Sequence, residues 1–302
     1  MCYKIGMEPQ EKFEEIVENV FAIHDDTYPL YIVKGEKNFL IDSGILPRAR
    51  QFHRNIETVL PGEKIDTLLL THSHYDHLGT ASYLQNIYEF DVRCSHQAAE
   101  LLNSPDMVEM IDYRNQEAKQ KFNDRSGTRF ETLKNVQGVA EGDRIRVDAN
   151  RFFEVFAVPG HSDCAVAYLL LPEKILFAGD AAGMKDHNGF IWPVFFSNYD
   201  QYEKSLARMD KIEAEALACG HARLIKGKEN VQAYFKEATA TTRRLKMEIL
   251  GKLHRGEEAM IIAESIQEKR FIPNSVLGEG EDFVMNVFAI VNTVSNALGP
   301  QG

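Results

Sequence analysis

The chain of 302 residues is 44% hydrophobic and 26% charged, and its formal net charge is −11. This composition is ordinary for a globular protein and provides apolar mass for one large domain, which argues against large-scale disorder. The acidic charge and the scattered lysines and arginines argue against a nucleic-acid partner, because such a partner is normally bound by a basic face.

The cysteines and the N-terminal segment bear on where the protein works. Four cysteines are present and none forms a C-x-x-C pair, so neither a disulfide framework nor a thiolate metal site is predicted. The first 15 residues contain no apolar signal core, and no stretch approaches the roughly 18 apolar residues that span a bilayer. We expect a cytoplasmic protein without a membrane partner.

The first two hundred residues alternate short apolar runs with helical patterns. Strands are predicted at 20–24, 30–33 and 38–41, and a helix follows at 47–60 with Pro47 in its first turn, where a missing N–H is tolerated. Further apolar runs predict strands at 65–70, 92–95, 152–158 and 165–171. This alternation predicts an α/β protein in which helices cover the sheets.

The character changes from Tyr199 onward, where only helices are predicted. Their expected ranges are 199–218, 230–253, 257–266 and 281–298. The final helix carries an apolar stripe that must be buried against something, formed by Phe283, Val284, Val287, Phe288, Val291, Val294 and Leu298. Since no flexible linker precedes these helices, we predict a catalytic domain at 1–225 and a helical extension at 226–302 that packs on it. The stripe could be buried in a lid over the site or, alternatively, in a homodimer interface.

One short segment concentrates groups that bind metal ions. Three of the ten histidines, His72, His74 and His77, lie within six positions, with Asp76 between them. His72 and His74 are two residues apart and would point the same way from an extended strand end. Imidazole and carboxylate groups suit first-row divalent ions, and one ion cannot easily take all four groups from so short a segment. The segment therefore predicts two ions.

Three later positions provide the groups that would complete such a site. Each of these residues, His161, Asp180 and His221, directly follows a glycine at the end of a predicted element. For His161 the element is strand 152–158, and for His221 it is a helical stretch. Backbone can approach a ligand closely at such glycines. Each position alone is a weak signal, but together with the first segment they indicate one metal centre.

This set of residues resembles the binuclear metallo-β-lactamase superfamily, whose fold is an αββα sandwich of two mixed sheets faced by helices. The resemblance rests on H-x-H-x-D-H at 72–77 followed by G-H, G-D and G-H. It implies that His72, His74 and His161 hold one ion, that Asp76, His77 and His221 hold the other, and that Asp180 bridges them. It also implies that Asp42 supports the site from behind the ligands.

Within the superfamily, the chain is most similar to thioesterases related to the quinolone-signal response protein PqsE and to the glyoxalase II type. The likeness lies in Thr71–His77, in Gly160-His161-Ser162-Asp163, and in the segment from Gly179 to Trp192-Pro193. His187, Trp192, Phe195 and Phe196 follow Asp180 closely and are predicted to line a substrate pocket, with a surface turn and its hydrophobic anchor as the alternative.

Two close divalent ions can share a water, lower its pKa and present a hydroxide to a carbonyl. Asp76 could in addition take and return a proton. Because a leaving thiolate needs little protonation, a site without an evident dedicated acid suits a thioester. We therefore predict hydrolysis of an ester or thioester, with zinc or iron, or manganese, as the metal. A lactonase, a phosphodiesterase, a redox di-iron protein and a non-enzymatic binding protein remain alternatives.

Overall fold

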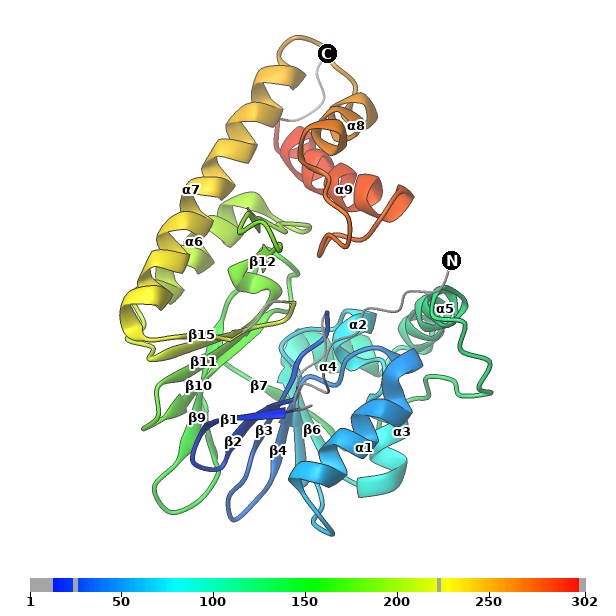
Figure 1. Cartoon of the computed structure of the whole chain (residues 1–302), viewed down its shortest axis with the longest axis vertical. Helices are drawn as coiled ribbons and strands as arrows, with labels where there is room; N and C mark the ends of the chain where they lie inside the picture. The colour runs from blue at the N-terminus through cyan, green and yellow to red at the C-terminus, as the bar shows by residue number, and fades with distance from the viewer. Residues whose placement is uncertain (1–12, 24–26, 222–223, 299–302) are drawn as a thin grey trace.

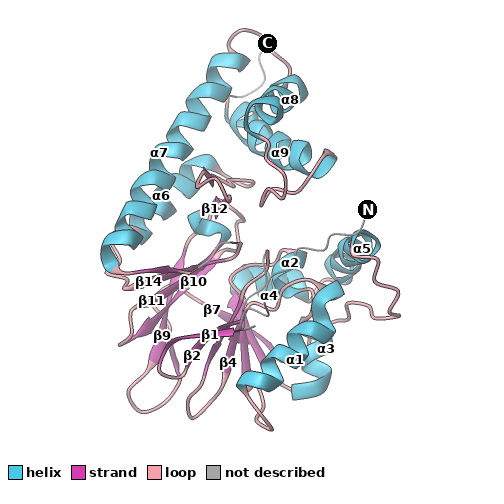
Figure 2. Ribbon diagram, viewed as in Figure 1, coloured by secondary structure: helices cyan, strands magenta, loops and turns pink. Residues whose placement is uncertain are grey.

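The computed structural model describes residues 13–23, 27–221 and 224–298 and shows two sheets packed face to face between two sets of helices (Figure 1). Figure 2 shows the strands in the middle and helices on both outer faces. This is the αββα sandwich of the metallo-β-lactamase fold, and the C-terminal helices follow it. The expected fold class is confirmed. His24, which falls in the predicted strand 20–24, lies outside the described residues.

The first sheet has the strand order β1 to β7. Its first four strands pair antiparallel and β4 to β7 pair parallel. The strands are β1 Phe13–Val17, β2 Val20–Ile23, β3 Leu30–Val33, β4 Phe39–Ile41, β5 Thr67–Leu69, β6 Asp91–Ser95 and β7 Val136–Val139. The outer face carries the 3₁₀ turn η1 Leu46–Arg48 and the helices α1 Ala49–Val59, α2 Tyr75–Leu78, α3 Ala81–Tyr88, α4 His96–Leu102 and α5 Pro105–Lys121.

The second sheet has the order β15-β14-β11-β10-β9-β8, and its β11–β14 pair is parallel. The strands are β8 Arg144–Arg146, β9 Phe152–Ala157, β10 Val166–Leu171, β11 Ile175–Gly179, β14 Ala216–Cys219 and β15 Ile225–Lys226. The turn η2 Asp180–Ala182 and a hairpin of β12 Met184–Lys185 and β13 Ile191–Trp192 follow β11. The helices on this side are α6 Tyr199–Met209, α7 Lys228–Leu253, α8 Ala259–Arg270 and α9 Glu281–Ala297.

Successive side chains of a strand point to opposite faces of the sheet, and the buried ones form three apolar layers. In β4, Phe39 packs between the sheets while Leu40 packs toward α1. Between the sheets, the Phe153 ring centroid lies 5.3 Å from that of Phe39 and 6.1 Å from that of Phe177. Both faces of these strands are buried, which explains why the sequence reads as continuous apolar runs.

One prediction about the C-terminal part is wrong. The predicted helix 199–218 ends at Met209, and its last part is strand β14, which lies between β11 and β15. The alanines and leucine of β14 favour a helix when considered alone, but the segment is an interior strand, second from the edge of its sheet, and is fully buried. Tertiary context overrides local propensity here. Strands therefore continue past Tyr199, and His221 follows a strand.

The C-terminal helices pack on the sandwich through a continuous core. The Trp192 ring centroid lies 5.2 Å from that of Phe283 in α9, and both side chains are fully buried. Of the predicted stripe, Phe283, Val287, Val291 and Val294 are buried, whereas Leu298 is 41% exposed. The core that holds α6 and α7 against the second sheet also contains these α9 residues. The division at 225/226 stays a prediction.

Candidate metal centre

The site lies where parallel strands of both sheets end. Asp42 and Thr71 follow β4 and β5, which are parallel, while Asp180 and His221 follow β11 and β14, which are also parallel. The carboxyl ends of parallel strands meet at one edge of a sheet, so each sheet presents its polar side chains at this edge. His161 joins them from the turn between β9 and β10. Strand pairing within each sheet and the packing of the two sheets bring together positions that are 179 residues apart in the sequence, from Asp42 to His221.

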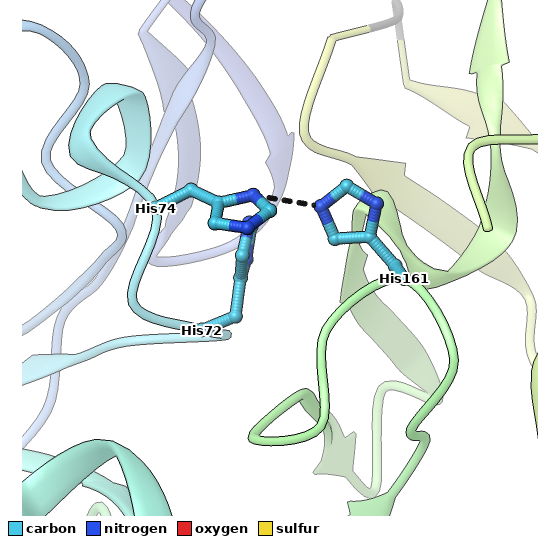
Figure 3. A group of neighbouring side chains, drawn as sticks. All are labelled: His72, His74 and His161. Atoms are coloured by element: carbon cyan, nitrogen blue, oxygen red, sulfur yellow. Dashed lines mark hydrogen bonds between the residues drawn. The ribbon is translucent and has the colours of Figure 1, made fainter. Parts of the chain in front are cut away.

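Three histidines form the first group. Figure 3 shows His72 and His74 from the loop after β5 and His161 from the facing loop, with their rings turned toward one another. Nε2 of His161 lies 3.0 Å from Nδ1 of His74, and one ring nitrogen from each of the three lies within 4.8 Å of the others. His72 and His161 are each 1% exposed. Three imidazole nitrogens at this spacing, two of them on buried rings, can face a single ion.

A second group consists of Asp76, His77 and His221. The Nε2 atoms of the two histidines lie 3.1 Å apart, and Oδ2 of Asp76 lies 3.4 Å from Nε2 of His221. These three side chains also offer ligand atoms within 4.8 Å of one another. Asp76 and His77 sit in α2, the single turn that begins just after His74. The H-x-H-x-D-H segment thus supplies both groups.

Asp180 lies between the two groups. Its Oδ2 atom is 3.3 Å from Nε2 of His77, 3.4 Å from Nε2 of His161 and 3.4 Å from Nε2 of His221. One carboxylate oxygen therefore contacts histidines of both groups. This position is the one that a bridging ligand would occupy.

The outward nitrogens of four histidines have partners of their own. Nδ1 of His77 lies 2.9 Å from Oδ2 of Asp42, and Nδ1 of His161 lies 2.7 Å from the carbonyl oxygen of Val194. Nδ1 of His221 lies 3.0 Å from the carbonyl oxygen of Thr27. The Thr71 hydroxyl donates to Asp42, which leaves its oxygen to accept from Nδ1 of His72 at 3.0 Å. Because these Nδ1 atoms face outward partners, Nε2 is the nitrogen of each ring that remains to face a metal ion.

The electrostatics of the cluster suit cations. Burial lowers the pKa of His72 and His74 and lowers that of His161 to about 3, so these rings are neutral. Burial also opposes a charge on His77 and His221, but nearby carboxylates outweigh it and raise both pKa values, to about 9 for His221. Asp180 and Asp42 act on His77, and Asp180 and Asp76 act on His221. The second group therefore attracts positive charge.

An independent observation indicates that the residues fit a pair of metal ions. Nε2 of His72 and Oδ1 of Asp180 are buried and, within the described part of the chain, have no hydrogen-bond partner. Buried polar atoms without partners are rare and call for an explanation such as an ion. Gly220 also permits the close approach, because a Cβ at this position would lie 2.2 Å from Oδ1 of Asp180 and 2.5 Å from Cε1 of His77.

The structure brings all seven predicted ligands together, with Asp42 behind them. The predicted pocket residues are placed differently. Trp192 and Phe195 are fully buried in the core, so no part of either ring is free to meet a substrate. The Phe196 ring, by contrast, lies 5.2 Å from that of His161. His187 is bonded through Nε2 to the carbonyl oxygen of Asn274 at 3.0 Å, in the loop between α8 and α9.

Sequence reasoning missed the groups that orient the histidines. Thr71 precedes His72 directly, and its hydroxyl was a detectable signal. The carbonyls of Thr27 and Val194 carry no side-chain signal, and only the fold reveals them.

The comparison with known families decides the identity of the fold. The family model described as the metallo-beta-lactamase superfamily matches residues 25–221. The chain belongs to the metallo-beta-lactamase superfamily. Together with the histidine and aspartate cluster, membership makes it a metal-dependent hydrolase of this fold. No described helix is both long enough and apolar enough to span a bilayer.

Several known proteins are similar to the chain. The metallo-beta-lactamase fold-containing protein ST1585 of Sulfurisphaera tokodaii is 25% identical over 210 residues, which cover 66% of this chain and 74% of that protein. The solved structure of the family protein TTHA1429 from Thermus thermophilus has a TM-score of 0.66 at 18% identity, covering 94% of this chain and 95% of the other. A beta-lactamase domain protein from Burkholderia ambifaria has a TM-score of 0.69 at 16% identity, covering 97% and 89%. These structural likenesses extend through the C-terminal helices.

Proposed function

We propose that the protein is a binuclear metal-dependent hydrolase that cleaves a thioester, with zinc or iron, or manganese, as the metal. The observation that carries the proposal is the position of Asp180, whose Oδ2 atom lies within 3.4 Å of Nε2 of both His161 and His221. His161 belongs to one ligand group and His221 to the other. A carboxylate shared in this way supports a two-ion site.

The ions, when bound, would lower the pKa of a shared water and polarise the carbonyl under attack. The chain's own residues set the conditions for this chemistry. Burial keeps His72, His74 and His161 neutral, so their nitrogens remain available as ligands. Asp76 would take a proton on the substrate side, and its exposure supports this role, because its side chain is the most exposed carboxylate of the cluster, at 19% against 2% for Asp180.

The choice of a thioester rests on the leaving group. Among the described residues, no lysine and no further histidine is hydrogen-bonded to any of the seven ligands. A thiolate, with a pKa of about 8.5, leaves with little protonation, whereas an amine or an alkoxide needs a stronger acid. The likeness to PqsE-related and glyoxalase-II-type thioesterases supports the same choice.

A substrate panel tests the proposal. The metal-loaded protein is assayed with acyl thioesters, lactones of matched acyl length and a phosphodiester, and kcat/KM is compared between classes. Asp180→Ala serves as the inactive control. We expect thioesters to be hydrolysed with the highest kcat/KM, and this activity to be lost in the control. Faster hydrolysis of lactones or phosphodiesters, or thioester hydrolysis that survives in Asp180→Ala, would overturn the proposal.

A further inference from the structure

A cavity of about 770 Å³ lies between the segment that begins α6, the C-terminal part of α7 and the last turns of α9. Its volume is in the range of sites for small organic molecules, about 300–1,000 Å³. None of the seven metal ligands lines it. The cavity is thus distinct from the metal cluster, and the C-terminal helices form much of its wall.

Phe196 lies between this cavity and the metal centre. It is one of the residues that line the cavity, and its ring lies 5.2 Å from the ring of His161. The Thr293 hydroxyl of α9 donates to the carbonyl oxygen of Phe196 at 3.1 Å. The carbonyl oxygen of Val194, two residues before Phe196, holds His161 at 2.7 Å. A molecule whose reacting carbonyl lies at the metal centre would therefore reach α9 by passing Phe196.

The cavity wall combines aliphatic surface with neutral amides. Leu250 and the exposed Leu298 supply aliphatic surface. Asn292 and Asn296 are one turn apart on α9, so they lie on the same face of the helix. Within the described part of the chain, neither carboxamide has a hydrogen bond to the protein, although Asn292 is half-buried. Each offers donors and an acceptor to a ligand.

The charges at the cavity are already paired. Lys246 is the cation in the lining, and its ammonium lies 3.5 Å from the ring centroid of Tyr199 and 3.7 Å from Oδ1 of Asp200. A phosphate site would need positive charge that is free to bind it. The lining favours a neutral molecule with amide groups and short aliphatic parts.

We propose that this cavity binds the neutral, amide-bearing thiol arm of a thioester substrate, of the chemical class of pantetheine, with Asn292 hydrogen-bonded to an amide of the arm. The inference rests on the proposed thioesterase function and adds which half of the substrate the cavity holds. A plain acyl chain would cover the half-buried carboxamide of Asn292 without offering it a partner, which is unfavourable. An amide arm satisfies that carboxamide and covers Leu250 and Leu298 with its aliphatic parts.

Binding of S-methyl pantetheine, a thioether that cannot be hydrolysed at this bond, tests the cavity without reference to activity. Titration calorimetry compares the metal-loaded wild type with Asn292→Leu, Asn296→Leu and the exposed control Asn103→Leu at the end of α4. We expect Asn292→Leu to weaken binding about tenfold, because the ligand amide loses its partner. Asn296→Leu should weaken it less, because Asn296 is exposed, and Asn103→Leu should leave it unchanged. Absent binding in the wild type, or equal affinity in all four proteins, would overturn the proposal.

Kinetics separate this proposal from the proposed function. The same acyl group is presented as its pantetheine thioester and as its ethanethiol thioester, which has no amide arm. Asn292→Leu should raise KM for the first about tenfold, with kcat and the ethanethiol reaction unchanged. If the protein hydrolyses both thioesters but Asn292→Leu shows no selective rise in KM, the proposed function stands and the cavity assignment is wrong. If the protein cleaves neither thioester but Asn292→Leu loses binding of S-methyl pantetheine, the cavity assignment stands and the proposed function is wrong.

Discussion

Oδ2 of Asp42 lies 2.9 Å from Nδ1 of His77, on the side of the ring that faces away from the other ligands. The same oxygen accepts the Thr71 hydroxyl at 2.8 Å, and Thr71 in turn contacts His72. One carboxylate behind the site therefore fixes the orientation of histidines that the sequence places in a single loop. Asp42 adopts a positive φ of 54°, a conformation that Asp and Asn tolerate.

Asp42→Asn should weaken metal binding about 10- to 100-fold while the fold is retained, because asparagine keeps the shape and the backbone conformation but removes the anionic acceptor for His77. Competition with a chelator of known affinity measures the change, and circular dichroism monitors the fold. Unchanged metal affinity would show that Asp42 does not orient His77.

Gly220→Ala should abolish binding of at least one ion, because the new Cβ would lie 2.2 Å from Oδ1 of Asp180 and must displace it. Gly127→Ala is the matched control, since nothing lies within 4 Å of a Cβ at that position. Metal content after gel filtration is measured for both. If Gly220→Ala retains the wild-type content, the carboxylate of Asp180 is not confined as described.

Asp186→Asn should lower the free energy of unfolding by about 2 kcal/mol or more. The buried carboxylate accepts from Nε1 of Trp192 at 2.6 Å, from the Ser275 hydroxyl at 2.9 Å and from the backbone N–H of Val276 at 2.8 Å. It thus ties the β12–β13 hairpin to the loop between α8 and α9. Denaturant unfolding measures the loss, and a change below about 0.5 kcal/mol would contradict this role.

Because the contact between Trp192 and Phe283 is fully buried, the role of the C-terminal helices is better tested by point variants than by deleting them. Removing the chain after Leu250 would uncover Trp192 and much of the core shared with α7, so loss of activity in such a truncation would report unfolding.

Asp112 predicts a pH-dependent contribution to stability. Burial opposes its charge, but hydrogen bonds from Gln116, the N–H of Phe130 and Arg129 lower its pKa below the usual value. Its contribution is therefore present above the unfolded-state pKa, about 4, and is lost as the pH falls through the lower folded-state pKa. Asp112→Asn should destabilise the protein at pH 7 and much less at pH 3. A difference that stays constant over this range would contradict the prediction.

The sequence predicted the metal ligands where they are concentrated in one segment, and it predicted strands and helices where buried apolar residues recur at a regular spacing. The segment from His72 to His77, with three glycine-preceded partners, was sufficient to predict the ligands that the structure brings together, because each ligand stands at the end of an apolar run. Strands such as Leu30–Val33 and helix α9 were recognisable from hydrophobic pattern alone.

Other features depend on contacts that no local pattern encodes. The segment Ala216–Cys219 has the composition of a helix and becomes a strand only because β11 and β15 flank it. Trp192 and Phe195 follow Asp180 closely in sequence, yet they turn into the core that α9 completes. Zinc, iron or manganese as the metal, the cytoplasmic location, and a lid or a homodimer interface as the role of the last helix stay predictions.

The most direct test of the two-ion account is the metal content of purified wild-type protein and Asp180→Ala, measured by elemental analysis together with hydrolysis of a thioester. The exposed variant Asp210→Ala serves as the control. We expect about two ions per chain and full activity in the wild type and in Asp210→Ala. Asp180→Ala should hold at most one ion and have almost no activity, because its carboxylate is shared by both ligand groups. A wild type that holds no more than one ion at saturation, or an Asp180→Ala protein with two ions and full activity, would contradict the account.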